Sequence, residues 1–219
     1  MTLSISSSFD AGNIKVERLD GPDQIELSIP KDHKSEFAQW FYFRLTGAKD
    51  TPCTIRITGL KDSAYPAGWP DYRAVVSEDR IDWTRADTRY DEAEGVLTIN
   101  VTPVTGAMWI AYFAPYSMER HHDLIAETAE VDGVEIETLG QTLDGQDMDL
   151  VKMGTGPLKL WIIARQHPGE AMGEWWMEGA LGALTDEADP VSRKLRERAT
   201  LYIVPNMNPD GSRRGHLRT

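Results

Sequence analysis

The chain has 219 residues, of which 41% are hydrophobic, and this length suffices for one large core or two smaller ones. Asp and Glu total 35 against 23 for Lys and Arg, and the net charge of -12 argues against general affinity for nucleic acid or anionic membranes. The single cysteine, Cys53, excludes an intrachain disulfide, and without a secretory signal or an apolar run of ~20 residues the chain is predicted to be cytoplasmic.

Short apolar segments separated by turn residues occupy the chain up to about residue 118. Several of them alternate apolar and polar side chains, as half-buried antiparallel strands do. The predicted strands span residues 13–19, 24–29, 39–46, 53–59, 73–77, 95–102 and 107–113. Because no helical pattern precedes residue 117, we predict an N-terminal antiparallel β-sandwich domain over residues 1–118.

From residue 119 the pattern becomes αβ, with strands predicted at 134–138, 148–153, 159–164 and 200–204. The nearly continuous apolar run 159–164 predicts a strand that is buried on both faces. A helix predicted over 169–185 would pack on the sheet through an apolar stripe of Met172, Trp176, Ala180 and Leu184, widened by Trp175 and Leu181. A second helix is predicted over 189–198. The fold class is therefore α+β overall, and residues 119–219 are predicted to start a doubly wound α/β domain whose ligands gather beyond the strand ends.

The tetrapeptide His167-Pro168-Gly169-Glu170 joins the apolar strand to the following helix. An imidazole and a carboxylate three residues apart at such a junction can hold one zinc ion between them, because zinc accepts both kinds of ligand. A catalytic zinc site normally takes three protein ligands, so the tetrapeptide would supply two of them. The alternative is a strand-to-helix turn with a capping carboxylate.

Two other histidine patterns are interpreted without a metal. His33 and Glu36 have the same spacing, but they follow Pro30 in a polar segment, and we interpret them as a surface pair. His121 and His122 are adjacent, and we place them on a strand, where neighbouring side chains point to opposite faces. Neither pattern is expected to bind zinc.

A second motif follows the predicted strand at 200–204. Pro205-Asn-Met-Asn-Pro-Asp-Gly211 has the composition of a turn held by Asn and Asp side chains, and Asp210 is interpreted as one of these turn residues. If the two apolar strands are neighbours, this turn lies beside His167 and Glu170. Three arginines come next: Arg213, Arg214 and Arg218.

These motifs together resemble a known family, the zinc metallocarboxypeptidases, and more narrowly its cytosolic carboxypeptidase branch. The resemblance rests on the order and spacing of Arg165-Gln-His-Pro-Gly-Glu170, the Asn-Pro-Asp-Gly turn, and Gly215-His-Leu-Arg-Thr219. Upstream, Trp40-Phe-Tyr-Phe-Arg44 and Ala114-Pro-Tyr-Ser117 are similar to segments of the β-sandwich that precedes the catalytic domain in this branch. The resemblance implies zinc-dependent hydrolysis at the C-terminus of a peptide or protein.

The resemblance also implies roles for single residues. His167 and Glu170 match the first two zinc ligands, and Arg218 matches the arginine that polarises the scissile carbonyl and stabilises the oxyanion. Amide hydrolysis needs a metal to activate water and a cation where negative charge develops. Relatives in this branch remove acidic residues, so Arg213 and Arg214 are candidates for a basic subsite, with a solvated basic loop as the alternative.

The sequence departs from the family at its C-terminal end. In the family, the third zinc ligand, a histidine, and the catalytic glutamate lie beyond the position of Thr219, and His216 is expected to line the site without binding metal. We therefore expect this chain to be the N-terminal part of a longer enzyme, with weak or absent zinc binding and no turnover by itself; the alternative is that the natural gene ends here.

Two other functions remain open at this point. A zinc amidohydrolase that deacylates N-acyl amino acids also uses a His-x-x-Glu pair after a strand, although it would not be expected to carry the sandwich. A non-catalytic binding module is the second alternative. The sequence does not determine the oligomeric state.

Overall fold

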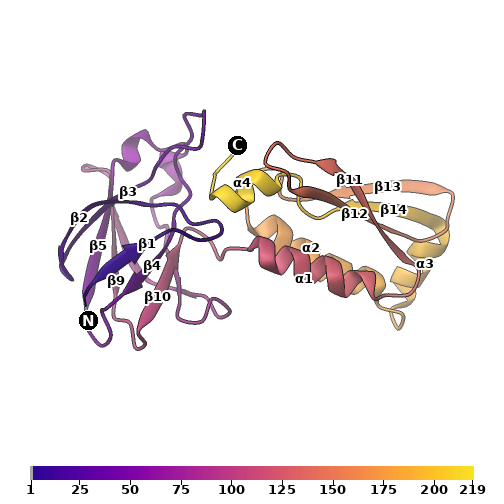
Figure 1. The fold of residues 1–219 in the computed structure, drawn as a ribbon, viewed down its shortest axis with the longest axis horizontal. Helices are drawn as coiled ribbons and strands as arrows, with labels where there is room; N and C mark the ends of the chain where they lie inside the picture. The colour runs from indigo at the N-terminus through magenta and orange to yellow at the C-terminus, as the bar shows by residue number, and fades with distance from the viewer. Residues whose placement is uncertain (1) are drawn as a thin grey trace. The chain divides into compact units, whose positions relative to one another are not determined.

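The computed structural model describes residues 2–219, which form two compact units (Figure 1). The first unit comprises the chain up to Pro115 together with Arg214–Thr219, and the second comprises Tyr116–Arg213. The last six residues of the chain therefore belong to the same unit as its N-terminal half.

The first unit contains two five-stranded sheets, and the β-sandwich prediction is confirmed. One sheet has the order β1 (Ser4–Ser6), β4 (Tyr42–Thr46), β10 (Ala107–Ala111), β6 (Val75–Ser77) and β7 (Thr84–Arg85). The other has the order β2 (Lys15–Gly21), β3 (Gln24–Ser28), β5 (Cys53–Thr58), β9 (Val96–Val101) and β8 (Asp87–Asp91). Neighbouring strands are antiparallel except β3 and β5, which run parallel. The strands β1, β7 and β8 were not predicted, because they are short or polar and lie at sheet edges.

Alternation along the central strands places the core between the sheets. In β5, Ile55 and Ile57 are fully buried, whereas the intervening Arg56 is exposed. Trp40 and Trp69 add the largest buried side chains of this unit. Each fully buried apolar side chain contributes about 1.5–3 kcal/mol relative to an exposed one, so this alternation accounts for much of the unit's stability.

The second unit is a four-stranded mixed sheet with helices. The strand order is β11 (Val134–Gln141), β12 (Asp147–Met153), β14 (Ala199–Val204) and β13 (Leu158–Ile163). The helices are α1 (Met118–Ala129), α2 (Met172–Thr185), α3 (Pro190–Arg198) and the short α4 (Pro209–Arg214). Strands β13 and β14 are parallel neighbours, while β12 joins β14 antiparallel, so the sheet is not wholly parallel. Helices α1 and α2 lie side by side along the sheet (Figure 1).

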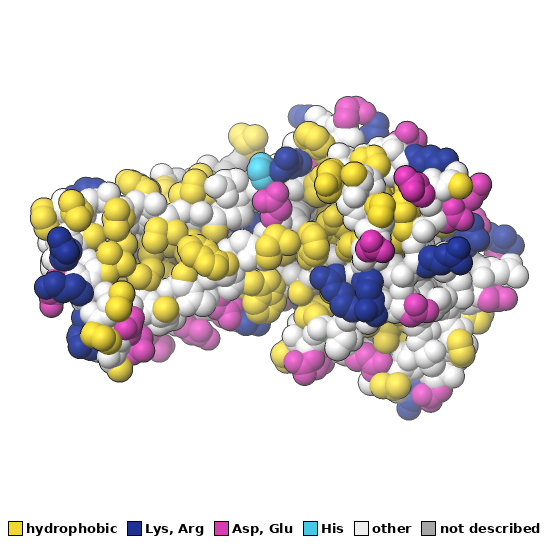
Figure 2. Space-filling model, turned by 180° about the vertical axis from the view of Figure 1, so that it is seen from behind, with side chains coloured by type: hydrophobic (Ala, Val, Ile, Leu, Met, Phe, Trp, Pro, Cys, Tyr) yellow, Lys and Arg dark blue, Asp and Glu magenta, His cyan; other side chains and the backbone are white. Residues whose placement is uncertain are grey.

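Two burial predictions for this unit are wrong. Strand β13 is not buried on both faces, because five of its six residues are exposed; within the described chain it is also an edge strand that pairs with β14 alone. Its Leu158 and Trp161 are 57% and 59% exposed. Helix α2 buries Leu181 of the predicted face and also Met177, whereas Trp176 on that face is 59% exposed. Hydrophobic side chains gather on the visible face of this unit, at the left of Figure 2.

The segment that was predicted as a strand around His121 and His122 is helical. Helix α1 begins after Ser117, whose side chain accepts a hydrogen bond from the Arg120 N–H, as an N-cap does. Met118, His121 and Leu124 then recur every three residues and form its buried face. Over the described residues, no helix is both long and apolar enough to cross a membrane.

Candidate active site

The loop between β13 and α2 carries the two predicted zinc ligands. Pro168 and Gly169 turn the chain so tightly that the Glu170 N–H donates to the His167 carbonyl at 3.0 Å. His167 Nδ1 consequently lies 3.2 Å from Glu170 Oε1, and the two side chains are 44% and 55% exposed. The structure thus brings the imidazole and the carboxylate together beyond the carboxyl end of β13 and leaves both accessible.

The separation of these two atoms fits a shared zinc ion. Ligand atoms about 2.1 Å from a tetrahedral zinc ion lie roughly 3.4 Å apart, close to the 3.2 Å between His167 Nδ1 and Glu170 Oε1. Between residues 2 and 219, no group of three or more His, Cys, Asp or Glu side chains is placed to hold a metal ion. His167 and Glu170 can therefore serve as two of the three protein ligands that a catalytic zinc takes.

Arg165 anchors this loop from its buried side. The side chain is 2% exposed, and its backbone has a φ of 49°, in the left-handed region that a non-glycine residue rarely adopts. Its Nε donates to the Pro168 carbonyl at 3.2 Å, and its Nη1 donates to the Tyr116 carbonyl at 2.7 Å and to Glu174 Oε2 at 2.6 Å. Gly173 lets α2 pack close to the Arg165 backbone, because a Cβ added to Gly173 would lie only 3.2 Å from the backbone nitrogen of Arg165.

Glu174 links Arg165 to a second buried side chain, His121. This carboxylate is fully buried, and its Oε1 lies 2.6 Å from His121 Nδ1. The other ring nitrogen, His121 Nε2, lies 2.9 Å from Asp149 Oδ2. Burial alone would lower the pKa of His121, but the hydrogen bonds to Asp149 and Glu174 outweigh it and raise the pKa to about 9. Arg165, Glu174 and His121 thus form a buried row of ionisable side chains, which ends at the partly buried Asp149.

The second motif is joined to the first by direct hydrogen bonds, because β13 and β14 are neighbours. The Met207 N–H donates to the Ala164 carbonyl at 3.0 Å, and Asn206 Nδ2 donates to Glu174 Oε2 at 3.1 Å. Asn208 Oδ1 accepts from the Gly211 N–H, which closes the turn. The buried Glu174 carboxylate therefore binds both the second motif, through Asn206, and the loop of His167 and Glu170, through Arg165.

Asp210 of the same motif stabilises another part of the second unit. Its carboxylate accepts hydrogen bonds from the Thr142 hydroxyl at 2.5 Å and from the Asp144 N–H at 3.1 Å. Both partners lie in the connection between β11 and β12. Asp210 thus lies in the first turn of α4 and holds the β11–β12 connection, rather than the turn that was predicted for it.

The three candidate arginines are divided between the units. Arg213 belongs to the second unit, whereas Arg214 and Arg218 belong to the first, and all three side chains are exposed. The backbone N–H of Arg218 donates to the carboxylate of Asp32 at 2.8 Å, within the first unit. His216 is buried in the same segment.

Comparison with known proteins identifies the family of both units. Residues 5–113 match the family described as "Cytosolic carboxypeptidase N-terminal domain", and residues 122–218 match "Zinc carboxypeptidase". A metallo-carboxypeptidase from Burkholderia cenocepacia has 48% sequence identity and a TM-score of 0.95, with 100% of this chain and 59% of that chain covered. The chain belongs to the zinc carboxypeptidases, in their cytosolic carboxypeptidase branch.

Two further relatives show how much of the family's length this chain spans. An uncharacterised protein of Zymomonas mobilis is 60% identical over 219 residues, which are 100% of this chain and 57% of that protein. Cytosolic carboxypeptidase 2 of Xenopus tropicalis is 28% identical over 250 residues, which cover 99% of this chain and 26% of that protein. The chain therefore spans little more than half of its bacterial relative.

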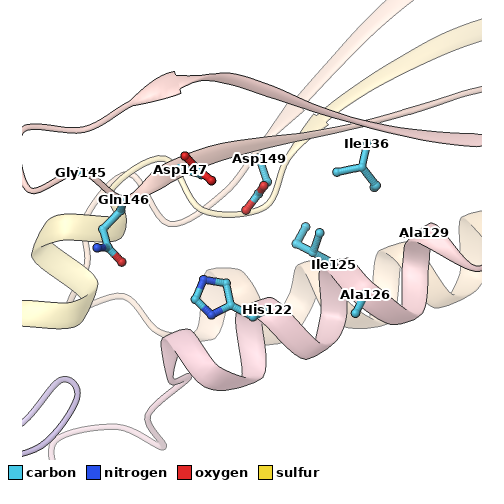
Figure 3. A pocket seen from close by; sticks show the side chains of 9 residues that line it. All are labelled: His122, Ile125, Ala126, Ala129, Ile136, Gly145, Gln146, Asp147 and Asp149. Carbon is cyan, nitrogen blue, oxygen red and sulfur yellow. The ribbon is translucent and has the colours of Figure 1, made fainter.

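A cavity of about 420 Å³ lies between α1 and the β11–β12 hairpin of the second unit (Figure 3). Its lining residues are His122, Ile125, Ala126, Ala129, Ile136, Gly145, Gln146, Asp147 and Asp149. His167 and Glu170 are not among them, so the candidate zinc ligands do not open into this cavity.

Sequence reasoning missed the buried residues that support the carboxypeptidase motif. Arg165 was part of the motif but was given no role, and Glu174 and Asn206 were not singled out. One signal was available for Glu174, because it follows Glu170 by one helical turn and is the acidic residue in the first turn of α2. The involvement of His121 could have been inferred only after α1 was recognised as a helix.

Proposed function

We propose that this chain carries the N-terminal part of a zinc-dependent metallocarboxypeptidase, which hydrolyses the C-terminal peptide bond of a peptide or protein. The observation that carries the proposal is the pairing of His167 Nδ1 with Glu170 Oε1 at 3.2 Å, at the end of β13 in the segment matched to zinc carboxypeptidases. The remaining zinc ligand and the glutamate that transfers protons come, in this proposal, from residues outside these 219.

The residues of the chain divide the work of amide hydrolysis. Bound zinc would polarise the scissile carbonyl and lower the pKa of a water molecule. His167 and Glu170 would hold the metal, and Arg165 fixes the loop between them through the Pro168 carbonyl. Arg218 donates hydrogen bonds to the oxygen on which negative charge develops, a contribution typically worth ~2.7–4 kcal/mol of barrier. Hydrolysis then adds water across the C–N bond, with the proton going to the leaving amine.

The proposal is tested with the whole protein, loaded with zinc and assayed on a peptide with a free C-terminus. We expect turnover that chelation abolishes and zinc restores. Glu170→Gln should lower zinc affinity and activity, because the amide is a poorer zinc ligand than the carboxylate. Glu36→Gln is the matched control, since Glu36 has the same spacing from a histidine, and it should leave both unchanged. Full activity in the Glu170→Gln protein would exclude this site.

We also propose a preference for substrates whose C-terminal residue is acidic. The exposed Arg213 and Arg214, the last two residues of α4, support this preference. Cationic side chains near a subsite favour carboxylate side chains. The Arg213→Ala/Arg214→Ala double variant should therefore lower kcat/KM for a peptide ending in Glu and leave a peptide ending in Leu unaffected. Equal cleavage of both peptides by the unmodified protein would contradict the preference.

The names of the relatives support a cytoplasmic location as part of the same proposal, since several are cytosolic carboxypeptidases. Fractionation of the cells that produce the protein tests this, and recovery outside the cytoplasm would contradict it.

A further inference from the structure

Asp32 binds the backbone of the C-terminal segment with one buried carboxylate. The side chain is 3% exposed and lies in the connection between β3 and β4. Its Oδ1 accepts the Leu217 N–H at 2.8 Å, and its Oδ2 accepts the N–H groups of Arg218 at 2.8 Å and Thr219 at 3.2 Å. Three successive backbone donors thus converge on one carboxylate, which is a strong, charge-assisted arrangement.

The neighbouring residue, His33, adds a second attachment. Its backbone N–H donates to His216 Nε2 at 3.2 Å, so Nε2 acts as an acceptor and the neutral ring carries its proton on Nδ1. That nitrogen is within hydrogen-bond distance of the Thr219 carbonyl. Gly215 allows the C-terminal segment to pass close to Ala11, because Gly215 has a φ of 71° and a Cβ added to it would lie 2.5 Å from the Ala11 carbonyl oxygen.

The loop that carries Asp32 is itself held in shape. The Asp32 N–H donates to the Phe37 carbonyl at 2.8 Å, and the Ser35 N–H donates to the Asp32 carbonyl at 3.1 Å. The carboxylate is therefore presented from a loop of the first unit that its own backbone hydrogen bonds close.

We propose that Asp32 is a positioning residue for Arg218: by binding three consecutive backbone N–H groups, it fixes the main chain from which the Arg218 side chain extends. This inference rests on the proposed function for the role of Arg218, but the backbone clamp can be measured independently. The β-sandwich unit thus supplies the carboxylate that orders the main chain of residues 217–219.

Asp32→Asn is the informative variant, because it keeps the shape of the side chain but replaces one acceptor oxygen with a donor. Asp79→Asn is the matched control. Asp79 Oδ1 also accepts two backbone N–H groups, from Ile81 at 2.8 Å and Asp82 at 2.9 Å, but it holds a different loop of the first unit. Amide hydrogen exchange of the peptide that covers residues 214–219 reports on the clamp, and kcat and KM of the whole protein report on Arg218.

We expect Asp32→Asn to accelerate exchange in this peptide by roughly tenfold or more, and Asp79→Asn to leave it unchanged. In the whole protein, Asp32→Asn should lower kcat by roughly tenfold with little change in KM, and should add little in an Arg218→Ala background. Unchanged exchange in Asp32→Asn would refute the clamp. Faster exchange with an unchanged kcat would refute the positioning role. A whole protein without any peptidase activity would refute the proposed function, and the exchange measurement would still decide on the clamp.

Discussion

The charge on buried His121 makes the stability of the second unit depend on pH. Its imidazole is 1% exposed and is bounded by Glu174 on one side and Asp149 on the other, with Arg165 on the far side of Glu174. The pKa rises from an ordinary 6.5 to about 9 in the folded chain. Because the folded pKa is the higher one, the stabilisation is fully present below about pH 6.5 and is lost as the pH rises through about 9.

The size of this effect follows from the pKa difference. A difference of about 2.5 units, at about 1.36 kcal/mol per unit, gives roughly 3 kcal/mol. Urea unfolding followed by circular dichroism at pH 6.5, 8 and 9.5 should show a fall of this order in the free energy of unfolding.

The neighbouring histidine provides the control for this experiment. His121→Gln should remove most of the pH dependence, because glutamine does not titrate. His122→Gln should retain it, since His122 is exposed and lies next to His121 on the same helix. An equal fall in stability for the unmodified chain and for His121→Gln, or a rise between pH 6.5 and 9.5, would refute the charged state of His121.

Two further predictions concern α2. Glu174→Gln should lower the free energy of unfolding by about 3–5 kcal/mol, because it leaves the buried guanidinium of Arg165 without its carboxylate, and a denaturant titration beside the exposed Glu127→Gln control measures this. Trp176→Lys should reduce the binding of a hydrophobic fluorescent dye and change the free energy of unfolding by no more than about 0.5 kcal/mol, because its side chain is 59% exposed; a loss of several kcal/mol would show that this face is packed.

The sequence could predict those parts of the fold and of the candidate site that depend on local patterns. The alternation in β5 and the strand-to-helix turn at His167 each lie within a few residues of chain, and both were found. The parallel direction of β13 and β14 agrees with the doubly wound arrangement that was predicted, although the sequence left open whether the two strands are neighbours.

The missed features depend on partners distant in the sequence. His121 is 53 residues from Glu174 and 28 from Asp149, and no spacing rule connects them. His121 also obscured the apolar pattern of α1, because a histidine on the buried face interrupts the run of apolar residues by which an amphipathic helix is predicted. The burial of β13 was overestimated for a related reason: an apolar run indicates what a strand could bury, whereas the elements that pack on the two faces of the sheet determine what it does bury.

The two His-x-x-Glu sequences of this chain show what makes such a spacing a candidate metal site. Glu36 pairs with Lys31, and His33 contributes its backbone to the attachment of the C-terminal segment. Glu170 instead faces His167, because the turn between them is closed by a hydrogen bond and anchored by Arg165. The difference lies in the buried Arg165 next to the His167–Glu170 turn. Its guanidinium donates to the Pro168 carbonyl and to the Glu174 carboxylate. The spacing supplies the donor atoms, and the closed turn with the buried Arg165 behind it places them 3.2 Å apart.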